Sequence, residues 1–464
     1  MKKIFKLILR VISFLPCLTS LQIIAHAESP KMIWVSSSEK AQWQEMPISE
    51  RGNEKGSPAS TITLDPGILY QNIDGFGGSF SELGWEALVA LPKEKRDTAL
   101  KDLFTAQGAN FTLGRAPIGA NDFSLGWYSL NETPEDYVME HFSVDRTKDA
   151  LLPYIKAAME YQPKLGVWAV PWCPPSWMTT TGEYSLGRMK QDPQTLGAYA
   201  LYFSKFVQAW RAEGINLYAV QPQNEPNYHN NIYPQCGWSG EELNVFLRDY
   251  LIPQFKKDNV NVEVWYGTIV NKNLPVFIDP VLGDEKTSAG ITGVGCQYAA
   301  RSSFAVIHEK YPDKKLMQTE TECNKGANSW EEGLTTYRRI IEDTSNFASS
   351  YFFWNMVLDE SGLSRWNWKQ NSMLTVDRKT RTIRYNPEFY SMRHFSATVR
   401  PGARRMAVSG GPFQNIVAFL NLDGSKVLQF ENASENIVTA SIDSGDDFVK
   451  LNVPAKSMNT IIIW

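Results

Sequence analysis

The sequence predicts an α/β fold, a (β/α)₈ TIM barrel with an attached β-sandwich to which both ends of the chain contribute. Two observations lead to this prediction. From about residue 75 to residue 396, apolar runs alternate with amphipathic stretches, in the pattern of a single barrel domain of roughly 250–320 residues. The two ends instead contain short alternating segments separated by turns, among them the hairpin signal Asp423-Gly424.

Eight apolar runs are expected to form the barrel strands. In chain order they lie at 74–78, 110–116, 164–170, 215–220, 262–269, 293–297, 315–319 and 349–353. The helical patterns between them include 93–105, 195–213, 241–255 and 330–342. Asp192 and Ser239 stand where two of these helices begin, and both residue types favour a helix N-terminus.

The β segments at the two ends are expected to form one sandwich. They lie within 31–69 and at 414–420, 426–431, 437–441 and 460–464. Neither end alone buries enough surface for a stable sheet, so both are needed. The predicted division of the chain is a signal peptide at 1–27, sandwich segments at 28–70 and 399–464, and the barrel at 71–398.

The first 27 residues have the pattern of a secretory signal peptide. Four basic residues within 2–10 precede an apolar stretch at 11–24 and the small-x-small sequence Ala25-His26-Ala27. The apolar stretch is shorter than the ~20 residues that a membrane-spanning helix needs. We therefore expect cleavage near Ala27 and an exported, periplasmic or extracellular protein without a transmembrane segment.

The charge and the cysteines exclude several functions. The formal net charge of −4 becomes −8 when the four basic residues of the signal peptide are removed. A mildly acidic chain lacks the basic surface that binds nucleic acid or anionic lipid, which favours a neutral substrate. The cysteines outside the signal peptide match no zinc-binding spacing, and both disulfides and buried free thiols are compatible with their positions: Cys173, Cys236, Cys296 and Cys323. No metal or cofactor is expected, and the oligomeric state cannot be read from the sequence.

Two glutamates at strand ends are the strongest indication of chemistry. Glu225, within Asn224-Glu225-Pro226, follows the fourth predicted strand, and Glu320 follows the seventh. The carboxyl ends of barrel strands surround the active site. A pair of carboxyl groups ~5–5.5 Å apart can cleave a glycosidic bond with retention, one as nucleophile and one as acid/base. Glu322 lies on the same face of an extended strand as Glu320, so alternation alone does not separate these two.

Several motifs near strand ends form a more specific combination than Asn-Glu-Pro alone. They are Gly75-Phe76-Gly77-Gly78, Asp122-Phe123-Ser124, the run Trp172-Cys173-Pro174-Pro175-Ser176-Trp177-Met178, and Gln223-Asn224-Glu225-Pro226. Together they resemble glycoside hydrolase family 30, the glucosylceramidase-like members of clan A of retaining (β/α)₈ hydrolases. The resemblance runs along nearly the whole mature sequence.

The resemblance implies roles for particular residues. Glu225 would be the acid/base and Glu320 the nucleophile. The sugar subsite would be lined by Asp122, Trp172, Asn224, Tyr233, Gln297, Tyr298 and Trp354. Each tryptophan could also be a core residue, but its position at a strand end favours packing against a sugar ring. Arg115 is expected inside the barrel, where it would hold the charge of a glutamate.

The expected function is an exported retaining β-glycosidase that acts on β-glucosides, with glucosylceramide or a related glycolipid as one candidate. Alternatives are an endo-β-1,6-glucanase, a β-xylosidase or a β-fucosidase of the same family. A non-catalytic carbohydrate-binding protein is a further alternative, but it would have no need of two glutamates. The glucosylceramidase branch commonly has a small residue and then Cys after the nucleophile, whereas this chain has Glu320-Thr321-Glu322-Cys323, which leaves the substrate open.

Overall fold

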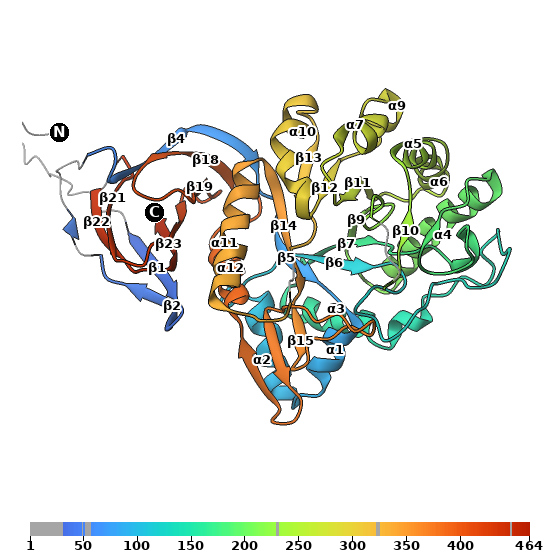
Figure 1. The fold of residues 1–464 in the computed structure, drawn as a ribbon, viewed down its shortest axis with the longest axis horizontal. Helices are drawn as coiled ribbons and strands as arrows, with labels where there is room; N and C mark the ends of the chain where they lie inside the picture. The colour runs from blue at the N-terminus through green and yellow to red at the C-terminus, as the bar shows by residue number, and fades with distance from the viewer. Residues whose placement is uncertain (1–30, 49, 52–56, 229–231, 322–324, 446–447) are drawn as a thin grey trace, which may run out of the picture.

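The computed structural model describes residues 31–48, 50–51, 57–228, 232–321, 325–445 and 448–464. Figure 1 shows two parts, a barrel surrounded by helices and, beside it, a sheet that carries the C-terminus. The predicted signal peptide, Glu322 and Cys323 lie outside the described residues. Among the described residues, no helix has both the length and the apolar character needed to cross a bilayer.

Eight parallel strands close the barrel, as the sequence predicted. In order around the barrel they are β5 (Gly75–Ser79), β6 (Leu113–Pro117), β7 (Gly166–Val170), β9 (Leu217–Val220), β11 (Glu263–Ile269), β12 (Gly293–Cys296), β13 (Lys315–Gln318) and β14 (Ala348–Asn355). Each predicted strand corresponds to one of these. β6 begins later than predicted, and Asn110 at the predicted start has a left-handed backbone with φ +54°, which a strand does not accommodate.

Helices surround the barrel and confirm the four predicted patterns. They are α1 (Glu82–Val89), α2 (Lys93–Phe104), η1 (Asp145–Lys148), α3 (Leu151–Tyr161), η2 (Ser176–Met178), α4 (Pro193–Ala212), α5 (Gly240–Val245), η3 (Phe246–Leu251), α6 (Ile252–Lys257), α7 (Leu274–Phe277), α8 (Asp279–Leu282), α9 (Glu285–Ser288), η4 (Tyr298–Ser303), α10 (Phe304–Lys310), α11 (Trp330–Ser345) and α12 (Pro387–Ser396). Asp192 and Ser239 cap α4 and α5 as expected. The helix predicted at 241–255 contains a π-helical turn, η3, because Pro253 has no N–H to continue the α-helical hydrogen bonds.

The second part is one ten-stranded sheet to which both ends of the chain contribute. Its order is β2 (Ala41–Met46), β1 (Met32–Ser38), β23 (Ser457–Ile463), β20 (Lys426–Asn432), β19 (Ile416–Leu420), β18 (Arg404–Gly410), β4 (Thr61–Asn72), β21 (Val438–Asp443), β22 (Phe448–Val453) and β3 (Glu50–Arg51). Strands far apart in this order, such as β1 and β22, bury side chains in one core, so the sheet folds over as a sandwich. The N-terminal β1 and β4 are paired with C-terminal strands, which confirms the shared sandwich.

Short strands extend the loops of the barrel. β8 (Gly187–Arg188) pairs with β10 (Cys236–Gly237), and β15 (Val357–Asp359), β16 (Leu374–Asp377) and β17 (Thr382–Tyr385) form a small sheet. Cys173, Cys236 and Cys296 are buried free thiols.

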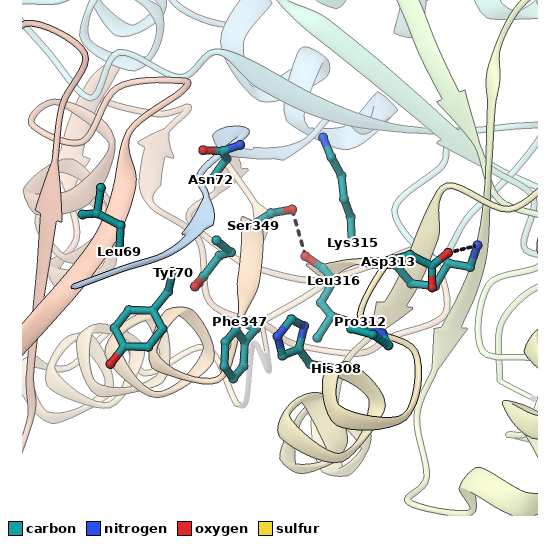
Figure 2. Close-up of a pocket in the computed structure, with 12 residues that line it drawn as sticks. Leu69, Tyr70, Asn72, His308, Pro312, Asp313, Lys315, Leu316, Phe347 and Ser349 are labelled. Carbon is teal, nitrogen blue, oxygen red and sulfur yellow. Dashed lines mark hydrogen bonds and ion pairs between the residues drawn. The ribbon is translucent and has the colours of Figure 1, made fainter. Parts of the chain in front are cut away.

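A cavity of about 420 Å³ opens at the end of the barrel where strands β13 and β14 begin (Figure 2). The two glutamates singled out in the sequence lie at the opposite end, beyond the last residues of β9 and β13.

Candidate active site

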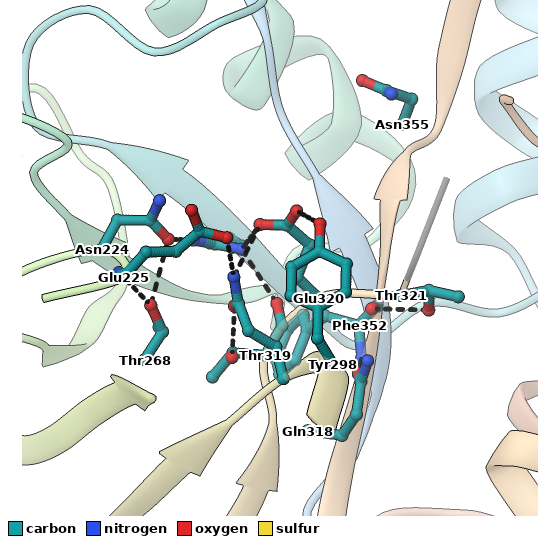
Figure 3. Close-up of polar contacts among 12 residues, drawn as sticks. Asn224, Glu225, Thr268, Tyr298, Gln318, Thr319, Glu320, Thr321, Phe352 and Asn355 are labelled. Carbon is teal, nitrogen blue, oxygen red and sulfur yellow. Dashed lines mark hydrogen bonds and ion pairs between the residues drawn. The ribbon is translucent and has the colours of Figure 1, made fainter. Parts of the chain in front are cut away.

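The candidate active site lies at the carboxyl ends of the barrel strands, where Glu225 and Glu320 approach each other (Figure 3). The chain leaves β9 and turns sharply at Glu225, whose φ is +49°. The backbone N–H of Glu225 donates to Thr268 Oγ1 (2.9 Å), and the N–H of Asn224 donates to the carbonyl of Pro171 (2.8 Å). These contacts with the neighbouring strands hold an otherwise unfavourable conformation and direct the Glu225 side chain into the site.

Uncharged donors bind the carboxyl group of Glu225. Tyr233 donates from its hydroxyl to Oε2 (3.0 Å), and Gln297 donates from Nε2 to Oε1 (2.7 Å). The residue is only 5 % exposed. Burial, and then the charge of Glu320, raise the pKa of Glu225 from 4.5 to about 7. This carboxyl group can therefore hold a proton near neutral pH.

A buried cation compensates the charge of Glu320. Nη1 of Arg115 lies 2.7 Å from Glu320 Oε2, and the Tyr298 hydroxyl donates to Oε1 (2.6 Å). Arg115 is fully buried, as the sequence predicted for a barrel arginine that holds a glutamate's charge. Its guanidinium lies 4.6–5.1 Å from the ring centroids of three tryptophans, Trp168, Trp172 and Trp354.

Gln297 joins the two carboxyl groups. Its Nε2 lies 2.7 Å from Glu225 Oε1 and 3.5 Å from Glu320 Oε2. The hydroxyl of Thr319 donates to Gln297 Oε1 (2.8 Å), so the amide group is oriented with its nitrogen toward the glutamates. The separation of the two carboxylate oxygens cannot exceed the sum of the two Nε2 distances. The carboxyl groups are therefore neighbours.

Asn224 and Asp122 add polar groups around this pair. Oδ1 of Asn224 accepts from Arg115 Nη2 (2.6 Å) and Thr268 Oγ1 (3.0 Å), and Figure 3 shows its nitrogen on the same side as the Glu225 carboxyl group. Asp122 is buried, and its Oδ1 has no hydrogen-bond partner among the described residues. Burial, and then the charge of Glu320, raise the pKa of Asp122 well above its usual value.

The comparison with known proteins agrees with this geometry. Residues 73–399 match the glycosyl hydrolase family 30 TIM-barrel domain, and residues 402–461 match the family 30 β-sandwich domain. The chain belongs to glycosyl hydrolase family 30. As a family 30 member it is an O-glycosyl hydrolase, which confirms the predicted family and reaction class.

Three relatives illustrate the similarity. Lysosomal acid glucosylceramidase of Mus musculus is 26% identical over 428 residues, which cover 86% of this chain and 83% of that protein. The structure of SrfJ from Salmonella typhimurium has a TM-score of 0.86 and 26% identity, and covers 94% of this chain and 99% of that one. The endo-β-1,6-glucanase BT3312 has a TM-score of 0.83 and 25% identity, and covers 93% and 99%.

In this family 30 enzyme, Trp172 and Trp354 lie at the site but do not offer open ring faces. They stack on each other at 5.3 Å, and each is 2 % exposed. One polar atom of this pair, Trp354 Nε1, has no hydrogen-bond partner among the described residues. The two stacked rings therefore pack against the Arg115 guanidinium.

An exposed tryptophan that the sequence analysis missed lines the same cavity as Glu225. Trp368 is 37 % exposed and its ring lies 5.7 Å from that of Tyr233. A cavity of about 340 Å³ is lined by Glu225, Tyr228, Tyr233, Val270, Tyr298, Trp368 and Gln370. Trp368 lies in the loop between β15 and β16, away from any predicted strand end. Its signal in the sequence is the run Trp366-Asn367-Trp368, two tryptophans in a polar segment.

Thr268 and Thr319, which hold Asn224 and Gln297, were also missed. Both are ordinary strand residues in the sequence, and only the closure of the barrel gives them these partners. In the described part of the chain, no group of three His, Cys, Asp or Glu side chains is arranged to hold a metal ion.

Proposed function

We propose that this enzyme hydrolyses β-glucosides with retention of configuration, with Glu225 as acid/base and Glu320 as nucleophile. The observation that supports this most directly is the shared contact with Gln297 Nε2, 2.7 Å from one carboxylate and 3.5 Å from the other. Because both carboxyl groups contact the same nitrogen atom, they face one site, as the close pair of a retaining enzyme requires.

The surroundings of Glu225 and Glu320 suit the two steps of a retaining mechanism. In the first, a Glu320 oxygen forms a bond to the anomeric carbon while the bond to the leaving oxygen breaks and that oxygen takes the proton of Glu225. In the second, ionised Glu225 removes a proton from water, which attacks the anomeric carbon and releases Glu320. A pKa of about 7 allows Glu225 to exchange this proton near neutral pH, and Arg115 supports the charge of Glu320.

Several unpaired polar atoms are available to the sugar. Asp122 Oδ1 and Trp354 Nε1 are buried without a partner among the described residues, and a buried polar atom is costly unless something binds it. Arg115 and Thr268 orient Asn224 through its oxygen, which leaves its amide nitrogen to donate to the 2-hydroxyl group, a contact that strengthens in the transition state. We propose that these groups bind hydroxyls of the glucose ring.

The leaving group is proposed to occupy the 340 Å³ cavity, because Glu225 lines it. The similarity to lysosomal acid glucosylceramidase supports glucosylceramide or a related glycolipid as one leaving-group class. A second candidate is endo-β-1,6-glucan hydrolysis. It is favoured by the partly exposed Trp368 ring, a surface on which a second sugar can stack, and by the likeness to BT3312.

The mechanism is tested by the anomer that forms first. Proton NMR during hydrolysis of an aryl β-glucoside should show the β-anomer before mutarotation, and an α-anomer would contradict the proposal. Rates on glucosylceramide, β-1,6-glucan and aryl β-glucosides, β-xylosides and β-fucosides then identify the substrate. Absence of hydrolysis across this panel would favour the carbohydrate-binding alternative.

We also propose that the protein is exported and that its signal peptide is removed near Ala27. The basic residues within 2–10, the apolar stretch at 11–24 and the sequence Ala25-His26-Ala27 support this. N-terminal sequencing of protein recovered outside the cytoplasm should begin near Glu28. Recovery of the intact N-terminus from the cytoplasm would contradict export.

A further inference from the structure

The loop between β15 and β16 brings a buried amide group to the cavity that Glu225 lines. Two residues of this loop, Trp368 and Gln370, line the 340 Å³ cavity that is proposed to hold the leaving group. Trp368 is partly exposed, whereas Gln370 is only 6 % exposed. Neither the proposed mechanism nor the predicted sugar subsite uses Gln370, so the role of its amide group is open.

The backbone of Gln370 is fixed by close packing within the loop. Its N–H donates to the carbonyl of Gly362 (2.9 Å). Its own carbonyl oxygen packs against two glycines, because a Cβ added at Gly362 would lie 2.8 Å from this oxygen and one added at Gly326 would lie 3.1 Å from it. Both glycines have positive φ, +64° and +72°, which a larger residue adopts only with strain. The Gln370 side chain therefore starts from a well-defined point.

Asn355 determines which end of the Gln370 amide group is available to a ligand. Asn355 ends β14 (Figure 3), and its Nδ2 donates to Gln370 Oε1 (3.0 Å) and to the backbone carbonyl of Asn371 (3.4 Å). A backbone carbonyl can only accept, so the Asn355 nitrogen faces it and Gln370 offers its oxygen to Asn355. The nitrogen of Gln370 is then left without a hydrogen-bond partner among the described residues. Unlike Trp354 Nε1, it is not sealed from solvent.

The rest of this cavity is also polar or aromatic. Of the described residues that line it, only Val270 lacks a polar side-chain atom, and the others are Glu225, Tyr228, Tyr233, Tyr298, Trp368 and Gln370. An alkyl chain bound here would cover Gln370 Nε2 without offering an acceptor, and a donor that loses water without gaining a partner costs free energy. A sugar offers hydroxyl oxygens that accept from such a donor.

We propose that Gln370 is a specificity-determining residue of the leaving-group cavity. Its amide nitrogen donates to a hydroxyl oxygen of a leaving group that is itself a sugar, and it thereby favours a sugar over an alkyl chain. A site built to bind a hydroxyl group discriminates against an analogue that lacks it. The inference rests on the proposed function, which places the leaving group in this cavity and gives its proton to Glu225.

The test compares leaving groups that need the proton of Glu225 alike. The best substrate among gentiobiose, laminaribiose and cellobiose is compared with octyl β-glucoside. All of them release an unactivated alcohol, so the ratio of kcat/KM for the disaccharide to kcat/KM for the octyl glucoside reports mainly on recognition of the leaving group. The parent enzyme should have a ratio above one.

Gln370→Met keeps the length of the side chain and removes the amide group. It should lower this ratio about three- to tenfold, the range expected for one hydrogen bond. Lys369→Met, the same replacement at the exposed neighbouring residue, should keep the parent ratio. If Gln370→Met does not fold, Gln370→Ala provides a second variant, because it opens the cavity to water and adds no apolar group; it should lower the ratio in the same direction.

A purely structural role of Gln370 would lower both rates equally, so an unchanged ratio in a folded variant overturns the proposal. A parent enzyme that prefers octyl β-glucoside also overturns it. Hydrolysis of an aryl β-glucoside by the parent distinguishes these results from failure of the proposed function. If the parent cleaves the aryl β-glucoside, only the role of Gln370 is refuted; if it cleaves none of these substrates, the proposed function fails and the role of Gln370 fails with it.

Discussion

The two sides of the active site use the same residue type and the same burial, yet they differ in charge. Glu225 and Glu320 are each 5 % exposed. Glu225 accepts hydrogen bonds from the neutral groups of Tyr233 and Gln297, whereas Glu320 is paired with the buried cation Arg115. Burial raises the pKa of Glu225, whereas the Arg115 guanidinium compensates the charge of Glu320. The partners, more than the glutamates themselves, therefore divide the proposed roles of acid and nucleophile.

The largest loss of activity should come from replacing Glu320, which follows β13. Glu320→Gln should reduce turnover to background because no carboxylate remains to attack the anomeric carbon. Glu320→Gly should be rescued by azide, which gives the α-glycosyl azide. The measurement is product analysis with an aryl β-glucoside, and Glu322→Ala is the matched control. Rescue of Glu322→Ala together with an active Glu320→Ala enzyme would show that the nucleophile is assigned to the wrong residue.

Replacing Glu225, which follows β9, should lower the rate by an amount that depends on the leaving group. Glu225→Gln should lower the rate about 10²–10⁴-fold for alkyl or sugar leaving groups, which need a proton. Aryl glucosides with acidic phenols should keep most of their glycosylation rate, measured as a pre-steady-state burst. In Glu225→Ala, azide should yield the β-glycosyl azide. Equal losses for both leaving groups would contradict the acid role.

Removing the cation tests the contrast directly. Arg115→Met leaves a buried carboxylate without its partner, which should lower the free energy of unfolding by about 3–5 kcal/mol, measured by urea denaturation. Arg146→Met is the control, because it breaks the ion pair with buried Glu82 (2.8 Å) away from the two glutamates. It should retain turnover at temperatures where it is folded. Normal turnover in Arg115→Met would show that Glu320 does not need the Arg115 charge for catalysis.

The two tyrosines provide a matched pair with smaller effects. Tyr298→Phe removes a hydrogen bond to a charged group, which should lower kcat/KM about 10–100-fold without moving the basic limb of the pH profile. The Tyr233 hydroxyl lowers the pKa of Glu225, so Tyr233→Phe should raise that pKa and move the basic limb upward. Identical pH profiles for the two variants would mean that the Tyr233 hydroxyl has no particular effect on the pKa of Glu225.

The smallest expected effect is a pH-dependent change in Tm when Glu225 is replaced. Because the pKa of folded Glu225 is raised from 4.5 to about 7, the folded state holds a proton that the unfolded state releases between these pH values. The contribution of this group is therefore present below pH 4.5 and is lost as pH rises through about 7. Glu225→Gln should have a higher Tm than the parent at pH 8 and a smaller advantage, or none, at pH 4.5. Equal differences at both pH values would argue against the raised pKa.

Much of the framework could be predicted from local patterns. Apolar runs separated by amphipathic helices indicate barrel strands, and a proline directly after Glu225 places that glutamate at a strand end. The expectation that Arg115 holds a glutamate was confirmed by its contact with Glu320. Trp368, in the loop between β15 and β16, was not predicted because it follows none of the strands that the sequence predicted and its loop carries no periodic signal.

By itself, the sequence determined the order of the eight strands, the shared sandwich and the positions of both glutamates at the carboxyl ends of β9 and β13. Alternation and turn chemistry are properties of neighbouring residues, so they can be read along the chain. Only the tertiary structure decided that Gln297 lies between the carboxyl groups and that Arg115 pairs with Glu320 rather than Glu225. Those contacts join residues more than twenty positions apart, and they exist because barrel closure brings different strand ends around one small space.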